Sequence, residues 1–149
     1  MDSRIAKPPP AGLVNLSMDA WTAPFWEAAA RHELNLPRCA DCGSYRMPPT
    51  PFCPHCRSQN IAWVAFDGAA ALYSYTIVER AIIPGSEDSI PYVPAIVEFQ
   101  GAGGVRLITN IIDCEIGRLE VGIPVDLRWI DLENGSALPA FTIETADNK

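Results

Sequence analysis

Cysteines are the residues in this 149-residue chain best suited to chemistry, and four of the five form two pairs. The pairs read Cys39-Ala-Asp-Cys42 and Cys53-Pro-His-Cys56, a C-x2-C-x10-C-x2-C spacing. Two residues between thiols let each pair curl into a knuckle that presents both sulfurs to one metal ion, while the intervening segment forms a hairpin. The spacing predicts one structural Zn²⁺ per chain, with four protein ligands and no open position for a substrate.

Two other chemistries fit the same cysteines. Disulfides are one, but the thiols of a cytoplasmic protein stay reduced. An iron centre of rubredoxin type is the other, because it uses the same tetrahedral thiolates. His55 lies inside the second knuckle and is interpreted as a bystander, since four thiolates are available. Cys114 stands alone and is interpreted as a small apolar residue near a strand end.

Charge and hydropathy indicate in which compartment the protein works and which classes of partner it does not bind. No apolar run is long enough to cross a bilayer, and the first residues lack the apolar stretch of a secretory signal, so we expect a cytoplasmic protein and no membrane partner. The formal net charge is −7. Residues 1–57 carry six basic and five acidic side chains, whereas residues 58–149 carry five basic and thirteen acidic ones. The acidic second half argues against nucleic acid as a partner.

The elements that position the knuckles are short. Thr22 is expected to cap a helix that runs to about His32 and places aromatic residues on one side. Residues 34–36 alternate as a strand that leads into Cys39. The first 20 residues, rich in proline, look like a mobile arm or a strap that orders on a partner.

From residue 61 onward the pattern becomes period-two segments divided by turn residues. The expected strands are 61–66, 72–78, 94–100, 105–112, 125–132 and 141–145, with a long loop over 81–92. This indicates a mainly β chain with an N-terminal helical arm (1–36), a rubredoxin-like zinc ribbon (37–60) and a five- to six-stranded OB-fold barrel (61–149). The predicted barrel interior is drawn from Tyr75, Ile77, Ile96, Leu107, Val125, Leu127 and Phe141.

Short motifs over about residues 21–143 resemble a known family, the acyl-CoA-associated proteins that join a rubredoxin-like zinc ribbon to an OB-fold, long catalogued as a domain of unknown function. The matching motifs are 25–27, 34–39, 42–43, 48–49, 53–54, Trp63, 75–78, 91–97, 122–125 and 139–141. The hairpin at Ala102-Gly103-Gly104 departs from the family pattern, where an acidic residue and a single glycine are expected.

The resemblance implies a non-catalytic subunit of a thiolase-type acyl-CoA enzyme complex that supports assembly and the access or transfer of the acyl-CoA substrate. Such a chain has no catalytic residues of its own and is a required part of an acyl-CoA acyltransferase. The partner is then thiolase-like, or another acyl-CoA enzyme subunit, in a heterotetramer. We expect the partner interface to use Trp21, Phe25, Trp26 and Tyr92; the alternative for any single one of them is that it packs on the barrel of this chain.

Two alternatives remain open. The first is that the chain binds CoA or acyl-CoA as a stand-alone module. Arg38, Arg46 and Arg57 are then the candidate phosphate contacts, because guanidinium groups pair with phosphates in bidentate fashion. The other alternative is a nucleic-acid-binding protein, since zinc ribbons and OB-folds often have that role; its site would need a basic groove with stacking aromatics.

Overall fold

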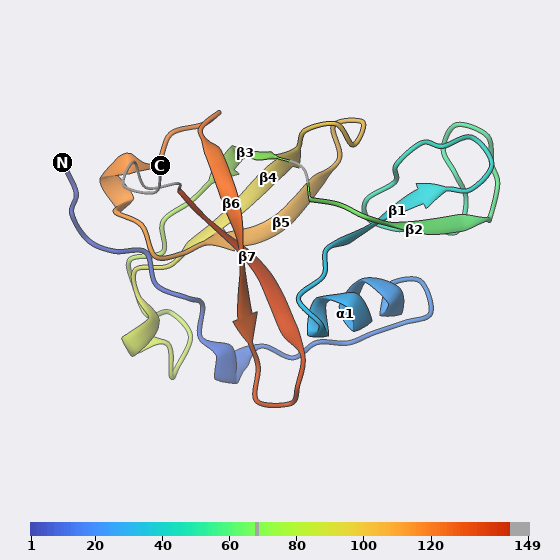
Figure 1. Ribbon diagram of the computed structural model, residues 1–149. Coiled ribbons are helices and arrows are strands. Elements are labelled where there is room, and N and C mark those ends of the chain that lie inside the picture. The colour runs from blue at the N-terminus through green and yellow to red at the C-terminus, as the bar shows by residue number, and fades with distance from the viewer. Residues whose placement is uncertain (68, 144–149) are drawn as a thin grey trace.

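The computed structural model describes residues 1–67 and 69–143. Figure 1 shows a barrel, a two-stranded ribbon at its side and a short helix below the ribbon. The helices are η1 (Ala11–Leu13), α1 (Ala23–Ala30), η2 (Glu87–Ser89) and η3 (Ile116–Arg118). The strands are β1 (Asn35–Cys39), β2 (Ile61–Ala65), β3 (Ala70–Tyr75), β4 (Val93–Phe99), β5 (Arg106–Ile111), β6 (Pro124–Asp131) and β7 (Ala137–Ile143). None of the helices in the described ranges is long and apolar enough to span a membrane.

The ribbon is an antiparallel pair of β1 and β2, with Asn35 opposite Ala65 and Cys39 opposite Ile61. The strand expected over 61–66 therefore exists, but it does not lead the barrel. It instead closes the ribbon by pairing with the strand that enters the first knuckle. Period-two alternation predicts a strand without naming its partner, because pairing depends on residues distant in the sequence.

The barrel is closed in the order β3-β4-β5-β7-β6, so it has five strands and confirms the mainly β OB-fold prediction. Neighbouring strands are antiparallel except β5 and β7, which meet in parallel at Ile111 and Phe141. β7 begins at Ala137, earlier than expected, because the turn at Gly135 is tight: Leu132 N–H donates to the Ser136 carbonyl at 2.8 Å.

Alternate residues of β4 contribute one row of the barrel core. Val93, Ala95, Val97 and Phe99 point inward and are buried. The Phe99 ring packs edge to face on Phe66 with centroids 5.1 Å apart. The prediction of Ile96 in the interior is wrong. Successive residues of a strand face opposite sides, and in β4 the inward side is taken by Ala95 and Val97, so Ile96 faces outward.

Other predicted interior residues lie where expected. Val125 and Phe141 are buried, and four residues are half-buried against the same core: Tyr75, Ile77, Leu107 and Leu127.

Helix α1 packs against β1 and β7 and buries Phe25. Thr22 holds the N-cap position, but its side chain makes no cap hydrogen bond. Asp19 orders the turn before it, where its Oδ1 accepts hydrogen bonds from the backbone N–H groups of Trp21 (2.9 Å) and Thr22 (2.8 Å). At the other end the His32 ring stacks on Trp129 at 5.4 Å, which fixes the helix to β6.

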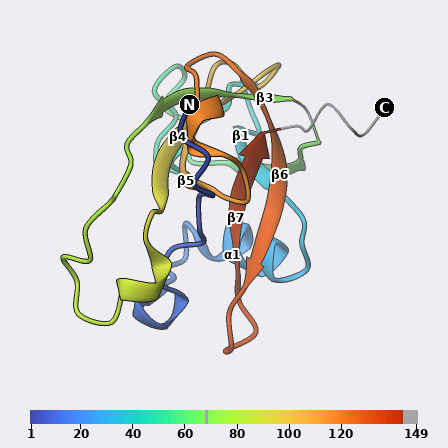
Figure 2. The same cartoon turned by 90° about the vertical axis from the view of Figure 1, so that its left-hand side faces the viewer.

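The N-terminal segment does not need a partner to become ordered. Ala6 is fully buried in the barrel core, and its N–H donates to the Cys114 carbonyl at 2.9 Å. Lys7 N–H donates to the Pro91 carbonyl at 2.9 Å. Figure 2 shows the segment, in dark blue, running along the barrel to η1. The expectation of a mobile arm is therefore wrong for these residues.

The position of Phe99 in the core predicts how much stability is lost when its side chain is truncated. Phe99→Ala is expected to lower the free energy of unfolding by about 3–5 kcal/mol, because it leaves a cavity between two aromatic rings. The matched control Ile108→Ala, at a side chain that is 82% exposed, is expected to change it by less than about 0.5 kcal/mol. Urea denaturation followed by tryptophan fluorescence measures both. Similar losses from both variants would contradict the assigned phase of β4 and β5.

Candidate metal centre and the surfaces around it

The first knuckle begins where β1 ends. Cys39 N–H donates to the Ser44 carbonyl at 2.8 Å, and Gly43 N–H donates back to the Cys39 carbonyl at 3.0 Å. Gly43 has a φ of +78°, a left-handed conformation that glycine adopts without steric cost. The loop therefore turns sharply enough to bring Cys42 beside Cys39.

The second knuckle repeats the same hydrogen bonds fourteen residues later. Cys53 N–H donates to the Ser58 carbonyl at 2.8 Å, and Arg57 N–H donates to the Cys53 carbonyl at 2.9 Å. Arg57 takes the place of the glycine and has a φ of +65°. The two knuckles are thus local copies, and each offers a pair of sulfurs.

The four sulfurs converge on one point. All four Sγ atoms of Cys39, Cys42, Cys53 and Cys56 lie within 4.8 Å of one another. Two pairs that cross between the knuckles are 3.6 Å (Cys39 to Cys56) and 3.5 Å (Cys42 to Cys53) apart. A tetrahedron with metal–sulfur bonds of about 2.3 Å has edges of about 3.8 Å, whereas a disulfide is about 2.05 Å long. The geometry fits one tetrahedral ion and no disulfide.

The electrostatics of the cluster favour a bound cation. The backbone N–H of Cys42 donates to the Cys39 sulfur and lowers the pKa of that thiol to about 6. The N–H of Ser58 acts to lower the pKa of Cys56, but desolvation and the neighbouring sulfurs outweigh it and raise that pKa to about 12. Four thiolates this close repel one another, so a divalent ion is needed to hold all four ionised.

A set of polar contacts supports the knuckles. The Asp41 carboxylate accepts hydrogen bonds from the Ser58 hydroxyl and from Asn60 Nδ2, the latter at 3.1 Å. The Arg46 guanidinium donates to the carbonyls of Ser58 (3.0 Å) and Asn60 (3.5 Å). These bonds tie the chain that leaves the second knuckle to the first knuckle and to the hairpin between them.

The three candidate phosphate-binding arginines divide into two groups. Arg46 is only 4% exposed and donates to backbone carbonyls, so its assignment as a phosphate contact is wrong: its charge serves the ribbon interior. Arg38 and Arg57 are exposed. Arg38 Nε donates to the Gly43 carbonyl at 3.0 Å, and its guanidinium lies 5.8 Å from the Tyr45 ring centroid. Contact of these two residues with CoA stays a prediction.

The predicted interface aromatics also divide. Phe25 is 6% exposed and belongs to the core of this chain, so it is not available to a partner. Trp26 packs edge to face on it at 5.0 Å and is half-buried. Trp21 is 38% exposed, and Tyr92 is half-buried at the base of the β3–β4 loop. Use of these three by a partner stays a prediction.

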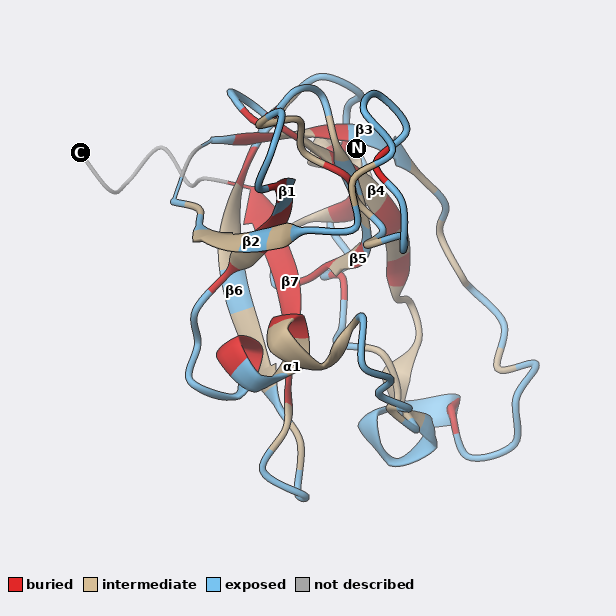
Figure 3. Ribbon diagram, turned by 90° about the vertical axis from the view of Figure 1, so that its right-hand side faces the viewer, coloured by how far each residue is buried: buried red, intermediate tan, exposed pale blue. Residues whose placement is uncertain are grey.

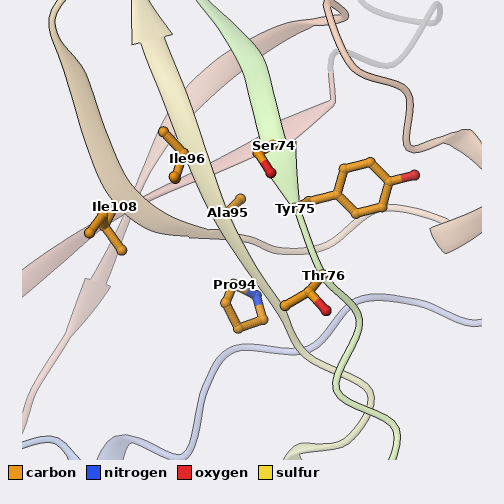
Figure 4. A pocket seen from close by; sticks show the side chains of 7 residues that line it. All are labelled: Ser74, Tyr75, Thr76, Pro94, Ala95, Ile96 and Ile108. Atoms are coloured by element: carbon orange, nitrogen blue, oxygen red, sulfur yellow. The ribbon is translucent and has the colours of Figure 1, made fainter.

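The sequence reasoning missed an apolar hollow on the outer wall of the barrel. It is lined by residues of β3, β4 and β5, including Pro94, Ile96 and Ile108 (Figure 4). Correct register would have revealed it, because these residues fall on the outward phase of β4 and β5, where polar side chains are expected.

Comparison with known proteins assigns the chain to a family. The ChsH2 rubredoxin-like zinc ribbon domain matches residues 26–62, and the ChsH2 C-terminal OB-fold domain matches residues 63–129. The chain belongs to this ChsH2 family. The family match and the four-sulfur geometry together identify a ribbon whose cysteines are positioned to bind one structural zinc.

Curated relatives are longer than this chain. The probable enoyl-CoA hydratase alpha subunit of Thermomonospora curvata is 39% identical over 118 residues, covering 78% of this chain and 36% of the relative. The 3-oxo-4,17-pregnadiene-20-carboxyl-CoA hydratase alpha subunit of Mycobacterium tuberculosis is 32% identical over 127 residues, covering 85% and 39%. The chain therefore spans little more than a third of the length of these relatives.

Solved structures share the whole architecture. A chain of the Ltp2-ChsH2(DUF35) aldolase superposes with a TM-score of 0.78 at 35% identity, covering 87% of this chain and 98% of that one. A DUF35-family protein of unknown function from Sulfolobus solfataricus superposes with a TM-score of 0.58 at 18% identity, covering 85% and 87%. The second likeness shows the fold alone.

The sulfur geometry predicts the effect of metal removal. We expect one zinc per chain by elemental analysis. A strong chelator, or the substitution Cys53→Ser, is expected to raise amide hydrogen exchange across residues 37–60 while residues 70–143 stay protected, because a ribbon this small has almost no core without metal. Cys114→Ser, at a buried thiol outside the cluster, is the control and should keep its zinc. Simultaneous loss of protection in ribbon and barrel would contradict this picture.

The burial of Arg46 gives a second prediction. Arg46→Ala is expected to destabilise the ribbon by about 1–3 kcal/mol, because it removes the buried guanidinium's hydrogen bonds to the carbonyls of Ser58 and Asn60, each of which then keeps only its backbone donor. Arg57→Ala, at an exposed side chain, is the control and should change stability by less than about 0.5 kcal/mol. The urea midpoint for zinc release reports the difference. Equal midpoints for the two variants would contradict the structural role of Arg46.

Proposed function

We propose that this chain is a non-catalytic component of an acyl-CoA enzyme, which it completes by binding a catalytic subunit. The observation that carries this proposal is the likeness to the Ltp2-ChsH2(DUF35) aldolase, which extends over 98% of the matched chain. The two curated relatives are named as alpha subunits of CoA-ester hydratases. Two of these names specify a CoA ester, and all three describe an enzyme made of more than one part.

The residues of this chain support a role without chemistry. Within residues 1–67 and 69–143, His32 is stacked on Trp129 and its Nε2 lies 2.5 Å from an Asp131 oxygen. Burial raises the pKa of the Cys114 thiol, which makes it a poor nucleophile. The other four cysteines form the closed metal site, which leaves no coordination position for substrate. These observations support the proposal that the catalytic groups belong to the partner.

The partner is a separate acyl-CoA-handling subunit, and we propose a thiolase-type fold and a heterotetramer of two copies of each chain. The names of the relatives favour hydratase or aldolase chemistry over acyl transfer. A thiolase-type fold remains compatible with aldolase chemistry, because one fold hosts several reactions. In the longer relatives the matched segment is one part of a larger subunit, which supports its use as a module attached to catalytic machinery.

Direct CoA binding by the isolated chain is the second candidate. The exposed guanidinium groups of Arg38 and Arg57 favour it. The excess of acidic groups in residues 58–149 opposes it, because CoA carries several negative charges. Calorimetric titration of the isolated chain with CoA separates the two candidates: binding that Arg38→Ala abolishes would support the second.

The proposal predicts what the tagged chain retains in an extract of its own cells. We expect one acyl-CoA hydratase, aldolase or thiolase subunit in constant ratio, together with one zinc per copy of this chain, because an accessory subunit is stable in its complex. Mass spectrometry and elemental analysis of the same sample measure this. Cys53→Ser serves as a matched sample in which the zinc is lost. Elution of the intact, zinc-bound chain alone or with nucleic acid would contradict the proposal.

A further inference from the structure

The outer wall of the barrel departs from the alternation that a sheet exposed to water should show. An antiparallel strand in a small barrel normally points apolar residues inward and polar residues outward. Here Ile96 on β4 and Ile108 on β5 lie directly opposite each other on the outward side, and Ile108 is 82% exposed. Pro94 continues the apolar strip along β4. Figure 4 shows these side chains around a hollow with a volume of about 250 Å³.

A polar boundary lies one step along the same strands. Glu98 is opposite Arg106, and Arg106 Nε lies 3.0 Å from the Glu98 carboxylate. The Arg106 guanidinium lies 3.8 Å above the Tyr73 ring. These charges are paired within the chain, and neither Glu98 nor Arg106 lines the hollow. An apolar centre with a polar rim is the arrangement found in protein–protein interfaces.

The β3–β4 loop, which begins beside the hollow, adds a second apolar feature. Its first residue, Thr76, donates its backbone N–H to the carbonyl of Pro94 on β4 at 3.0 Å, and both residues line the hollow. It presents Ile82, 82% exposed, and Ile83, 48% exposed. Figure 3 shows much of this loop in the pale blue of exposed residues. Two neighbouring exposed isoleucines are unfavourable in water, and a loop longer than about 12 residues in a small domain is usually functional.

The loop is held in one conformation by specific bonds. Ser86 is 1% exposed, and its hydroxyl donates to the Ile83 carbonyl at 2.5 Å. Lys7 Nζ donates to the Asp88 carbonyl at 3.3 Å, and Val78 and Tyr92 pair through their backbones at the base. A preorganised loop lowers the conformational entropy lost when a partner binds.

We propose that Pro94, Ile96 and Ile108 on the wall, with Ile82 and Ile83 on the loop, form one docking surface for the catalytic subunit. The inference rests on the proposed function and adds the surface that performs it. The net charge argues against a second copy of this chain as the partner: residues 58–149 carry eight more acidic than basic side chains, although on the loop itself Glu79 is paired with Arg4 at 2.5 Å. A second copy of this chain, also at −7, would be repelled. The matching surface on the catalytic subunit is apolar with a basic rim.

The test uses Ile108→Asp and Ile82→Asp, with Val121→Asp as the matched control, because Val121 is 63% exposed and does not line the hollow. The probe is the acyl-CoA enzyme subunit that co-purifies with the wild-type chain. Each docking variant is expected to raise Kd by about 30-fold or more, the ratio typical of an interface hot spot, while Val121→Asp stays within about two-fold. Added salt should lower the association rate. Circular dichroism and zinc content should match the wild type in all three variants.

The outcomes separate the two claims. Wild-type affinity in both docking variants overturns the docking surface and leaves the proposed function standing. Failure of the wild-type chain to retain any acyl-CoA enzyme overturns the proposed function, and the inference with it. If sedimentation shows a wild-type homodimer that Ile108→Asp converts to a monomer, the surface belongs to a second copy and the assignment to a catalytic subunit is wrong.

Discussion

Convergence of four sulfurs on one metal ion is the constraint on which the ribbon and its placement against the barrel depend. The ribbon has little apolar interior, so its two knuckles stay together because Cys39, Cys42, Cys53 and Cys56 need a shared divalent cation to ionise together. β1 links the metal site to the barrel, because Leu36 on this strand is fully buried in the core cluster that the ribbon shares with the barrel. The metal therefore fixes the ribbon and, through β1, its placement beside α1 and the barrel.

The parts of the account that the sequence alone predicted depend on local spacing. The cysteine pairs, the helix near residue 25, most of the strands and the OB-fold all follow from patterns within about ten residues. Partners and phases could not be predicted in the same way. Ile61–Ala65 pairs with β1 instead of the barrel, and Ile96 faces outward, because both depend on register with distant strands.

Side-chain roles were harder to predict than side-chain positions. Arg46 and Phe25 have the residue types of a phosphate contact and an interface anchor, and both are buried within this chain. Arg46 gives the carbonyls of Ser58 and Asn60 a second donor beside their backbone ones, and Phe25 gives α1 an aromatic ring in the core. The exposed side chains that best fit an interface are instead aliphatic ones on the barrel wall, where Ile108 has the highest exposed fraction among the large hydrophobic residues of the described strands.

We propose that this zinc-stabilised chain is non-catalytic and that its outer barrel wall receives a catalytic subunit. The most direct test of this claim is the turnover of an acyl-CoA substrate by the purified catalytic subunit, by this chain, and by the two mixed in equal amounts. The account predicts no turnover by this chain alone and faster turnover by the mixture than by the catalytic subunit alone. Turnover by this chain alone, or a mixture no faster than the catalytic subunit, would contradict it.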